Sequence, residues 1–147
     1  MHQRCTETGM RHLFAYGSLM CADIMREVAG CDLPGAEAVL HGYRRVVVRG
    51  EQYPGLVPAD GKSVKGVVYR DVPSSAWDRL DRFEGEMYIR QSVQVSLKHG
   101  GIVRADAYVV RPEFRDRLED SDWAFDEFLR NGKARFQRYY RGYRSLD

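Results

Sequence analysis

Hydrophobic and polar residues alternate along this chain in short blocks that have the length of strands. Residues 12–16 form a brief apolar run that stops at Gly17, as expected for a buried strand that enters a turn. Later segments with a strand-like pattern and turn residues at their ends are 36–48, 64–72, 88–97 and 102–110. The sequence therefore predicts a domain that is built mainly from strands.

Turn residues between these segments predict how the strands are connected. Residues 50–59 read as a loop that contains Pro54 and Pro58, and Asp60-Gly61 after it is a hairpin signal. The glycine-rich turn at 98–101 is predicted to join the last two strands as a hairpin.

Two short helices are expected between the strands. Residues 22–29 carry apolar side chains on one side, and Gly30 follows as a helix-ending residue. A second helix is predicted over 75–83, with Ser74 as its N-cap and Gly85 beyond its end. The predicted apolar faces are Ile24, Met25 and Val28 in the first helix, and Trp77, Leu80 and Phe83 in the second.

Beyond Pro112 the pattern becomes helical, in two pieces that Asn131-Gly132 separates. Strands with short helices inserted, followed by helices, predict an α+β fold with a small, mainly antiparallel sheet or barrel and flanking short helices. The sequence contains neither GxGxxG nor GxxxxGK[ST], which argues against a nucleotide-binding loop. We expect one domain over 11–147 and a flexible tail at 1–10, where no periodicity is found.

Composition and charge are those of an ordinary soluble domain. The 147 residues are 44% hydrophobic and 30% charged, and the net charge of +2 is too small to indicate binding to nucleic acid or membranes. No apolar run approaches the roughly 18 residues of a membrane span, and the polar start lacks the apolar core of a secretion signal. We therefore expect a cytoplasmic protein that binds neither nucleic acid nor membranes.

Cysteine and histidine spacing argues against a metal site. Cys5, Cys21 and Cys31 are odd in number and lack CxxC spacing, which argues against a disulfide framework and a zinc site and fits a reducing compartment. The histidines are scattered and form neither HxH nor HExxH: His2, His12, His41 and His99.

The turn after the first strand is a candidate anion-binding element. A buried strand that ends at Gly17-Ser18 can direct consecutive backbone N–H groups outward, and such groups bind anions. The alternative is a tight turn that binds no ligand.

Glu84 is a candidate acid/base residue. It follows the helix predicted at 75–83, and the partial negative charge of a helix C-terminus, together with neighbouring aromatic residues, should raise its pKa. A carboxylate with a raised pKa is a better general base. The alternative is a solvated glutamate in the last helical turn.

Five segments, in order along the chain, resemble one family: FAYGSL, YPGLVP, VKGVVYRD, LDRFEGEMYIR and ADAYVV. They are similar to the γ-glutamylcyclotransferase-like superfamily, particularly its AIG2-like and γ-glutamylamine cyclotransferase branches, from Leu13 to about Val110. The resemblance implies a small β-barrel whose cavity takes a γ-glutamyl group. It also implies a cofactor-independent enzyme that converts a γ-glutamyl amide to 5-oxoproline and releases an amine or amino acid.

The resemblance assigns roles to individual residues. Glu84 matches the family's single acid/base carboxylate, and the turn at 16–19 matches its substrate loop, whose backbone N–H groups hold the glutamyl carboxylate. Residues 21–25 replace the Arg- or Lys-Gly that often follows this loop, so family contacts beyond the loop are not carried over. The substrate-binding residues implied are Tyr16, Gly17, Ser18, Leu19, Tyr53, Pro54, Gly55 and Tyr88.

The same residues allow other interpretations. Glu86 with Glu84 suggests a carboxylate pair for glycoside hydrolysis, but adjacent turn residues diverge and no sugar-binding aromatic pattern surrounds them. Cys21 follows the turn, but no histidine lies at an informative spacing.

Residues 133–144 mix cations with aromatics, which suits single-stranded nucleic acid or, as we favour, an amphipathic helix with its aromatics on the barrel and its arginines solvated. Such a helix would cap the pocket or form a dimer contact.

Two classes of function follow from these patterns. One is the cyclising enzyme, acting on a small γ-glutamyl substrate as a monomer or homodimer. The other is a noncatalytic binding or stress-response module on the same fold. For the enzyme, γ-glutamyl amino acids, γ-glutamyl-ε-lysine, biosynthetic γ-glutamyl intermediates and glutathione-like peptides all fit as substrates.

Overall fold

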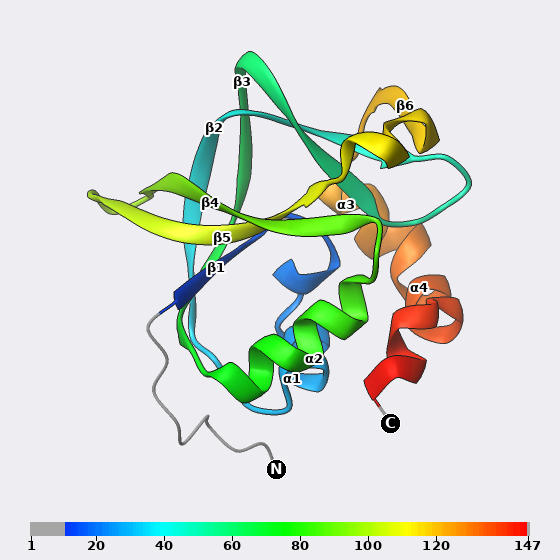
Figure 1. Ribbon diagram of the computed structural model, residues 1–147, viewed down its shortest axis with the longest axis horizontal. Coiled ribbons are helices and arrows are strands. Elements are labelled where there is room, and N and C mark those ends of the chain that lie inside the picture. The colour runs from blue at the N-terminus through cyan, green and yellow to red at the C-terminus, as the bar shows by residue number, and fades with distance from the viewer. Residues whose placement is uncertain (1–10, 147) are drawn as a thin grey trace.

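Five strands close into a barrel with helices packed around it (Figure 1). The computed structural model describes residues 11–146, so the predicted tail at 1–10 lies outside the described residues. The strands are β1 (Arg11–Ala15), β2 (Gly35–Val48), β3 (Pro54–Val72), β4 (Tyr88–Leu97), β5 (Ile102–Val110) and β6 (Leu118–Asp122). The helices are α1 (Ala22–Ala29), α2 (Ser74–Glu84), α3 (Phe125–Glu127) and α4 (Lys133–Tyr139), with 3₁₀ turns at Ser18–Met20, Pro112–Arg117 and Arg141–Leu146 and a π turn at Phe128–Gly132.

Hydrogen bonding between the strands confirms the predicted fold class. The strand order is β3-β1-β5-β4-β2, and β2 pairs with β3 again, which closes the ring. β1 and β5 run parallel, with Leu13 opposite Asp106, whereas the other neighbouring strands are antiparallel. β6 adds to β2 outside the ring. The fold is therefore α+β, with a small, mainly antiparallel barrel and flanking short helices.

The β2–β3 hairpin differs from its prediction. β3 begins at Pro54 and continues through Asp60-Gly61, so the loop predicted at 50–59 is found only over 50–53, and the turn predicted at 60–61 is wrong. The chain instead turns at 49–53, and residues 59–62 bulge opposite Gly42, where the register of β2 against β3 shifts. Gly61 has a φ of 78°. Because a left-handed glycine fits a bulge as well as a tight turn, the local sequence does not separate the two.

The two predicted helices between strands are present, and one begins a residue early. Gly30 ends α1 with a φ of 84°, as predicted. α2 begins at Ser74 with Pro73 at the N-cap, so Ser74 is the first helical residue rather than the cap. The predicted apolar faces of both helices are buried. Within residues 11–146, no helix is long and apolar enough to cross a membrane.

The part of the chain beyond Pro112 departs most from prediction. β6 was not predicted, because its five residues are mainly polar and show no apolar period. Pairing with β2 holds it in place, and the Arg44 guanidinium binds both Asp120 and Asp122. The helix predicted to break at Asn131-Gly132 instead continues through these residues as a π turn.

β1 separates two apolar clusters and thereby positions the turn that follows it. Phe14 and Tyr16 belong to the cluster inside the barrel, whereas Leu13 and Ala15 belong to the cluster between the barrel and the helices. This alternation follows from the two-residue period of a strand. The turn after β1 therefore begins where the two clusters meet.

The cysteines differ in bonding state. Cys31 is disulfide-bonded, so the expectation that the chain lacks disulfides does not hold for this residue. Cys21 is a free, buried thiol, and burial raises its pKa. A buried thiol with a raised pKa is a poor nucleophile, which is consistent with setting Cys21 aside as a catalytic residue.

Candidate active site

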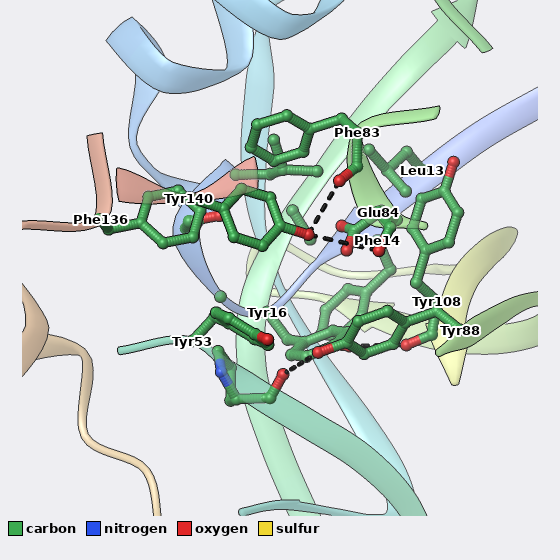
Figure 2. A pocket seen from close by; sticks show the side chains of 15 residues that line it. Leu13, Phe14, Tyr16, Tyr53, Phe83, Glu84, Tyr88, Tyr108, Phe136 and Tyr140 are labelled. Carbon is green, nitrogen blue, oxygen red and sulfur yellow. Dashed lines mark hydrogen bonds between the residues drawn. The ribbon is translucent and has the colours of Figure 1, made fainter. Parts of the chain in front are cut away.

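A pocket at the end of the barrel brings the predicted site residues together (Figure 2). It is narrow and lies between the turn after β1 and the last residue of α2. Glu84 lines it from α2. The predicted binding residues that also line it are Tyr16, Gly17, Ser18, Leu19, Tyr53, Pro54 and Tyr88.

Gly55 is the predicted binding residue that does not line this pocket. It lies in β3, where a Cβ would come within 2.7 Å of Val110 Cγ2 and 2.8 Å of Leu118 Cδ2. The close approach of these two side chains is therefore what requires a glycine here. Its position gives Gly55 a packing role next to the site.

The turn after β1 lines the pocket. Its internal hydrogen bonding includes the Met20 N–H to the Gly17 carbonyl at 3.0 Å. The N–H groups of Ser18 and Leu19 lie at the start of this 3₁₀ turn, where a helix does not use its own donors. The Tyr69 hydroxyl donates to the Leu19 carbonyl at 2.6 Å and so holds the turn against β3.

Pro54 packs directly on the turn because Gly17 has no side chain. A Cβ on Gly17 would lie 2.9 Å from both Cγ and Cδ of Pro54. From β4, the Tyr88 hydroxyl donates to the Pro54 carbonyl at 2.8 Å. These contacts fix Tyr53 and Pro54, the two residues that lead into β3, beside the turn.

Glu84 is the last residue of α2, and Gly85, with a φ of 82°, ends the helix there. Within residues 11–146, no hydrogen bond or ion pair engages the Glu84 carboxylate. Burial, followed by the negative charge of Asp81 one turn earlier, raises its pKa to about 8. The predicted direction of the shift is therefore found, with burial rather than the helix terminus as the main cause. Figure 2 shows Glu84 among the tyrosines Tyr16, Tyr88, Tyr108 and Tyr140.

Tyr108 is a pocket residue that sequence reasoning missed. Its hydroxyl donates to the Asp81 carboxylate at 2.7 Å, and its carbonyl accepts from the Tyr16 hydroxyl at 2.6 Å. Arg90 pairs with the same carboxylate, with 3.0 Å between Nε and Oδ1. The segment ADAYVV lies in β5, and Tyr108 is the buried tyrosine within it.

The C-terminal segment closes the pocket, which sequence reasoning offered as one of two roles for it. Phe136 and Tyr140 line the pocket, and the Tyr140 hydroxyl donates to the carbonyls of Phe83 at 2.8 Å and Glu84 at 3.3 Å. Tyr139, by contrast, is 62% exposed, so the expectation that the aromatics here pack on the barrel is wrong for this residue.

A second, wider pocket adjoins the first. Charged residues of both signs line it. The residues that line both pockets are Tyr53, Phe83, Glu84, Tyr88, Phe136 and Tyr140. Glu84 therefore lies at the boundary between a narrow inner pocket and a wide outer one.

Comparison with known proteins shows the family to which this chain belongs. Residues 13–125 match the family described as gamma-glutamyl cyclotransferase, AIG2-like. The chain belongs to this family. The resemblance drawn from the five sequence segments is thus confirmed. The matched range includes the turn, Glu84 and Tyr108, whereas Tyr140 lies beyond it.

The similar proteins of known sequence include two from Arabidopsis thaliana. AIG2-like protein D is 35% identical over 88 residues, which are 60% of this chain and 58% of the relative. Protein AIG2 C is 29% identical over 118 residues, which are 80% of this chain and 71% of the relative. The chain thus spans less than two thirds of the first relative's length, and neither name states a reaction.

Solved structures share the fold. An Arabidopsis thaliana protein determined in solution superposes with a TM-score of 0.68 and 26% identity, over 91% of this chain and 82% of that chain. A protein described as gamma-glutamyl cyclotransferase gives a TM-score of 0.61 at 20% identity, over 74% of this chain and 68% of that one. At this identity, the second likeness concerns the fold alone.

Proposed function

We propose that this protein cyclises a γ-glutamyl amide to 5-oxoproline and releases an amine or amino acid, without a metal or cofactor. Glu84 is the general acid/base. The observation that carries the proposal is that Glu84, which has a pKa of about 8 and no partner for its carboxylate within residues 11–146, lines the same pocket as the turn after β1. One side of the pocket suits a carboxylate, and the other suits proton transfer.

A γ-glutamyl amide needs little beyond orientation because it carries its own nucleophile. Its α-amine reaches the γ-carbonyl carbon and closes a five-membered lactam, so no water is consumed. Orientation of this kind can lower a barrier by about 7 to 11 kcal/mol in favourable cases. Here the N–H groups of Ser18 and Leu19 would hold the α-carboxylate, which sets the direction of the rest of the substrate.

The pKa of Glu84 suits the proton that has to move. An α-ammonium group has a pKa of about 7.7 to 8.0, so its transfer to a Glu84 with a pKa of about 8 is nearly balanced in free energy. The same transfer to an ordinary glutamate would be uphill by about 5 kcal/mol. After ring closure, the Glu84 carboxylic acid gives this proton to the leaving nitrogen. The regenerated carboxylate then takes the second proton from the attacking nitrogen and releases it to solvent.

A panel of γ-glutamyl amides tests this function. The panel contains γ-glutamyl amino acids, γ-glutamyl-ε-lysine and glutathione, with the protein first dialysed against a chelator. We expect at least one member to give 5-oxoproline and free amine in equal amounts. The matched α-glutamyl isomers should be inert, because their geometry cannot form the lactam at the same amide. Binding of the panel without any turnover would contradict the proposal and favour a noncatalytic module.

A further inference from the structure

Tyr53 differs from the other tyrosines of the inner pocket in the hydrogen bonding of its hydroxyl. The hydroxyls of the other four donate to protein acceptors at 2.6 to 2.8 Å: Tyr16, Tyr88, Tyr108 and Tyr140. Among the residues described, 11–146, none hydrogen-bonds to the Tyr53 hydroxyl. A polar group that the fold leaves unsatisfied inside a pocket is available to a ligand.

The fold nevertheless holds Tyr53 firmly. Its ring meets Tyr140 and Phe136 edge-on, with centroid distances of 5.1 and 6.2 Å. Its neighbour Pro54 packs on Gly17 of the turn. Packing rather than hydrogen bonding therefore positions the ring, so its hydroxyl is a preorganised donor.

The location of this hydroxyl matches what ring closure requires. Tyr53 lines the inner pocket, which the turn also lines. It lines the outer pocket as well, as Glu84 does. In Figure 2 its hydroxyl is turned toward Tyr16 and Tyr88, on the pocket side of the ring. Burial, and then the charge of Glu51, raises the pKa of Tyr53 to about 12. The hydroxyl therefore keeps its proton over the pH range in which Glu84 ionises.

We propose that Tyr53 is a catalytic residue that donates a hydrogen bond to the γ-carbonyl oxygen as negative charge develops there. This role rests on the proposed function. The attacking α-amine forms the new C–N bond, and the carbonyl π electrons move to the oxygen, which Tyr53 stabilises. When the carbonyl re-forms, the C–N bond to the leaving amine breaks. That nitrogen takes the proton that Glu84 accepted from the attacking amine, while Tyr53 keeps its own.

Ser18 is the side-chain donor in this pocket from which Tyr53 has to be distinguished. In this proposal its hydroxyl adds to the backbone N–H groups that hold the substrate carboxylate, a group whose charge does not change during the reaction. An interaction that is equal in the ground state and the transition state affects KM and leaves kcat unchanged. An interaction with the developing oxyanion affects kcat.

Tyr53→Phe removes the hydroxyl and keeps the ring contacts. We expect kcat to fall about 10²- to 10³-fold, as for other single oxyanion donors, with little change in KM. Ser18→Ala should raise KM with little change in kcat. Tyr43→Phe, at a tyrosine outside both pockets, should match the wild type in both constants. A folded Tyr53→Phe protein that keeps its kcat, or changes only in KM, would overturn the inference.

Affinity for 5-oxoproline supplies a readout that does not depend on turnover. The lactam carbonyl descends from the γ-carbonyl, so Tyr53→Phe should weaken binding by about 2- to 10-fold in calorimetry, as expected for one neutral hydrogen bond. Equal affinity in the two proteins would overturn the contact with Tyr53. A wild type that binds 5-oxoproline through Tyr53 but forms none from any amide would instead overturn the proposed function and leave the contact standing.

Discussion

The Tyr140 hydroxyl donates to the backbone carbonyl of Phe83 at 2.8 Å and lies 3.3 Å from the carbonyl of Glu84. These carbonyls belong to the last turn of α2, where helical carbonyls have no partner within the helix. Gly142 makes the approach possible, because a Cβ there would overlap both the Phe83 carbonyl and the Tyr140 ring. The C-terminal segment therefore stabilises the helix end that carries the proposed acid/base residue.

Replacing this hydroxyl should destabilise the protein. We expect Tyr140→Phe to lower the free energy of unfolding by about 1 kcal/mol, as for one lost hydrogen bond. The neighbouring Tyr139 is 62% exposed, so Tyr139→Phe is the matched control and should unfold like the wild type. Urea unfolding measures both. Equal stability of Tyr140→Phe and the wild type would mean that the Tyr140–Phe83 bond contributes nothing.

The raised pKa of Glu84 predicts a specific dependence of stability on pH. In the unfolded chain its pKa is near 4.5, whereas the folded protein holds it at about 8. Between these pH values the folded state binds one proton more than the unfolded state. The free energy of unfolding therefore falls as pH rises toward 8. Above pH 8, where both states are ionised, the loss stops growing.

Glu84→Gln should therefore gain stability over the wild type with rising pH. At up to 1.36 kcal/mol per pH unit, the difference in unfolding free energy between the two proteins should grow by about 3.5 kcal/mol from pH 5 to pH 8. Asp78→Asn, an exposed position on the same helix, should follow the pH dependence of the wild type. Denaturant unfolding at several pH values gives all three curves. A constant difference between Glu84→Gln and the wild type would show that the pKa of Glu84 is not raised.

The contact between Gly17 and Pro54 can be tested by adding a methyl group. Gly17→Ala places a Cβ 2.9 Å from the Pro54 ring, so we expect a loss of about 1 to 3 kcal/mol in unfolding stability. Pro54→Ala in the same chain removes the ring carbons that the methyl meets. The double variant should then be more stable than the sum of the two single losses predicts, by at least about 0.5 kcal/mol. Strict additivity would show that the two residues do not meet.

Much of the barrel was predictable because its strands alternate buried and exposed residues and its turns contain glycine. The signals that failed were local and ambiguous. Gly61 could mark a turn or a bulge, and only pairing with β2 decides between them. β6 has no apolar period because hydrogen bonds to β2 and the ion pairs of Arg44 hold it, rather than burial.

The site was predictable to the extent that its residues lie close together in sequence motifs. The turn at 16–19 and Glu84 were predicted in this way, and both line the same pocket. Tyr108 and Tyr140 were missed because their roles depend on partners far along the chain, such as the Phe83 carbonyl that Tyr140 binds. The cause of the Glu84 shift was also beyond sequence reasoning, since burial arises from several elements that close around the side chain.

The most direct test of the central claim is the rate of 5-oxoproline formation by Glu84→Gln, measured beside the wild type and Asp78→Asn at pH 8. If Glu84 transfers the proton, its replacement should lower kcat by about 10²- to 10⁴-fold, the usual contribution of a general acid/base. Asp78→Asn, with its side chain exposed on the same helix, should turn over at the wild-type rate. A folded Glu84→Gln protein with the turnover of the wild type would contradict the account.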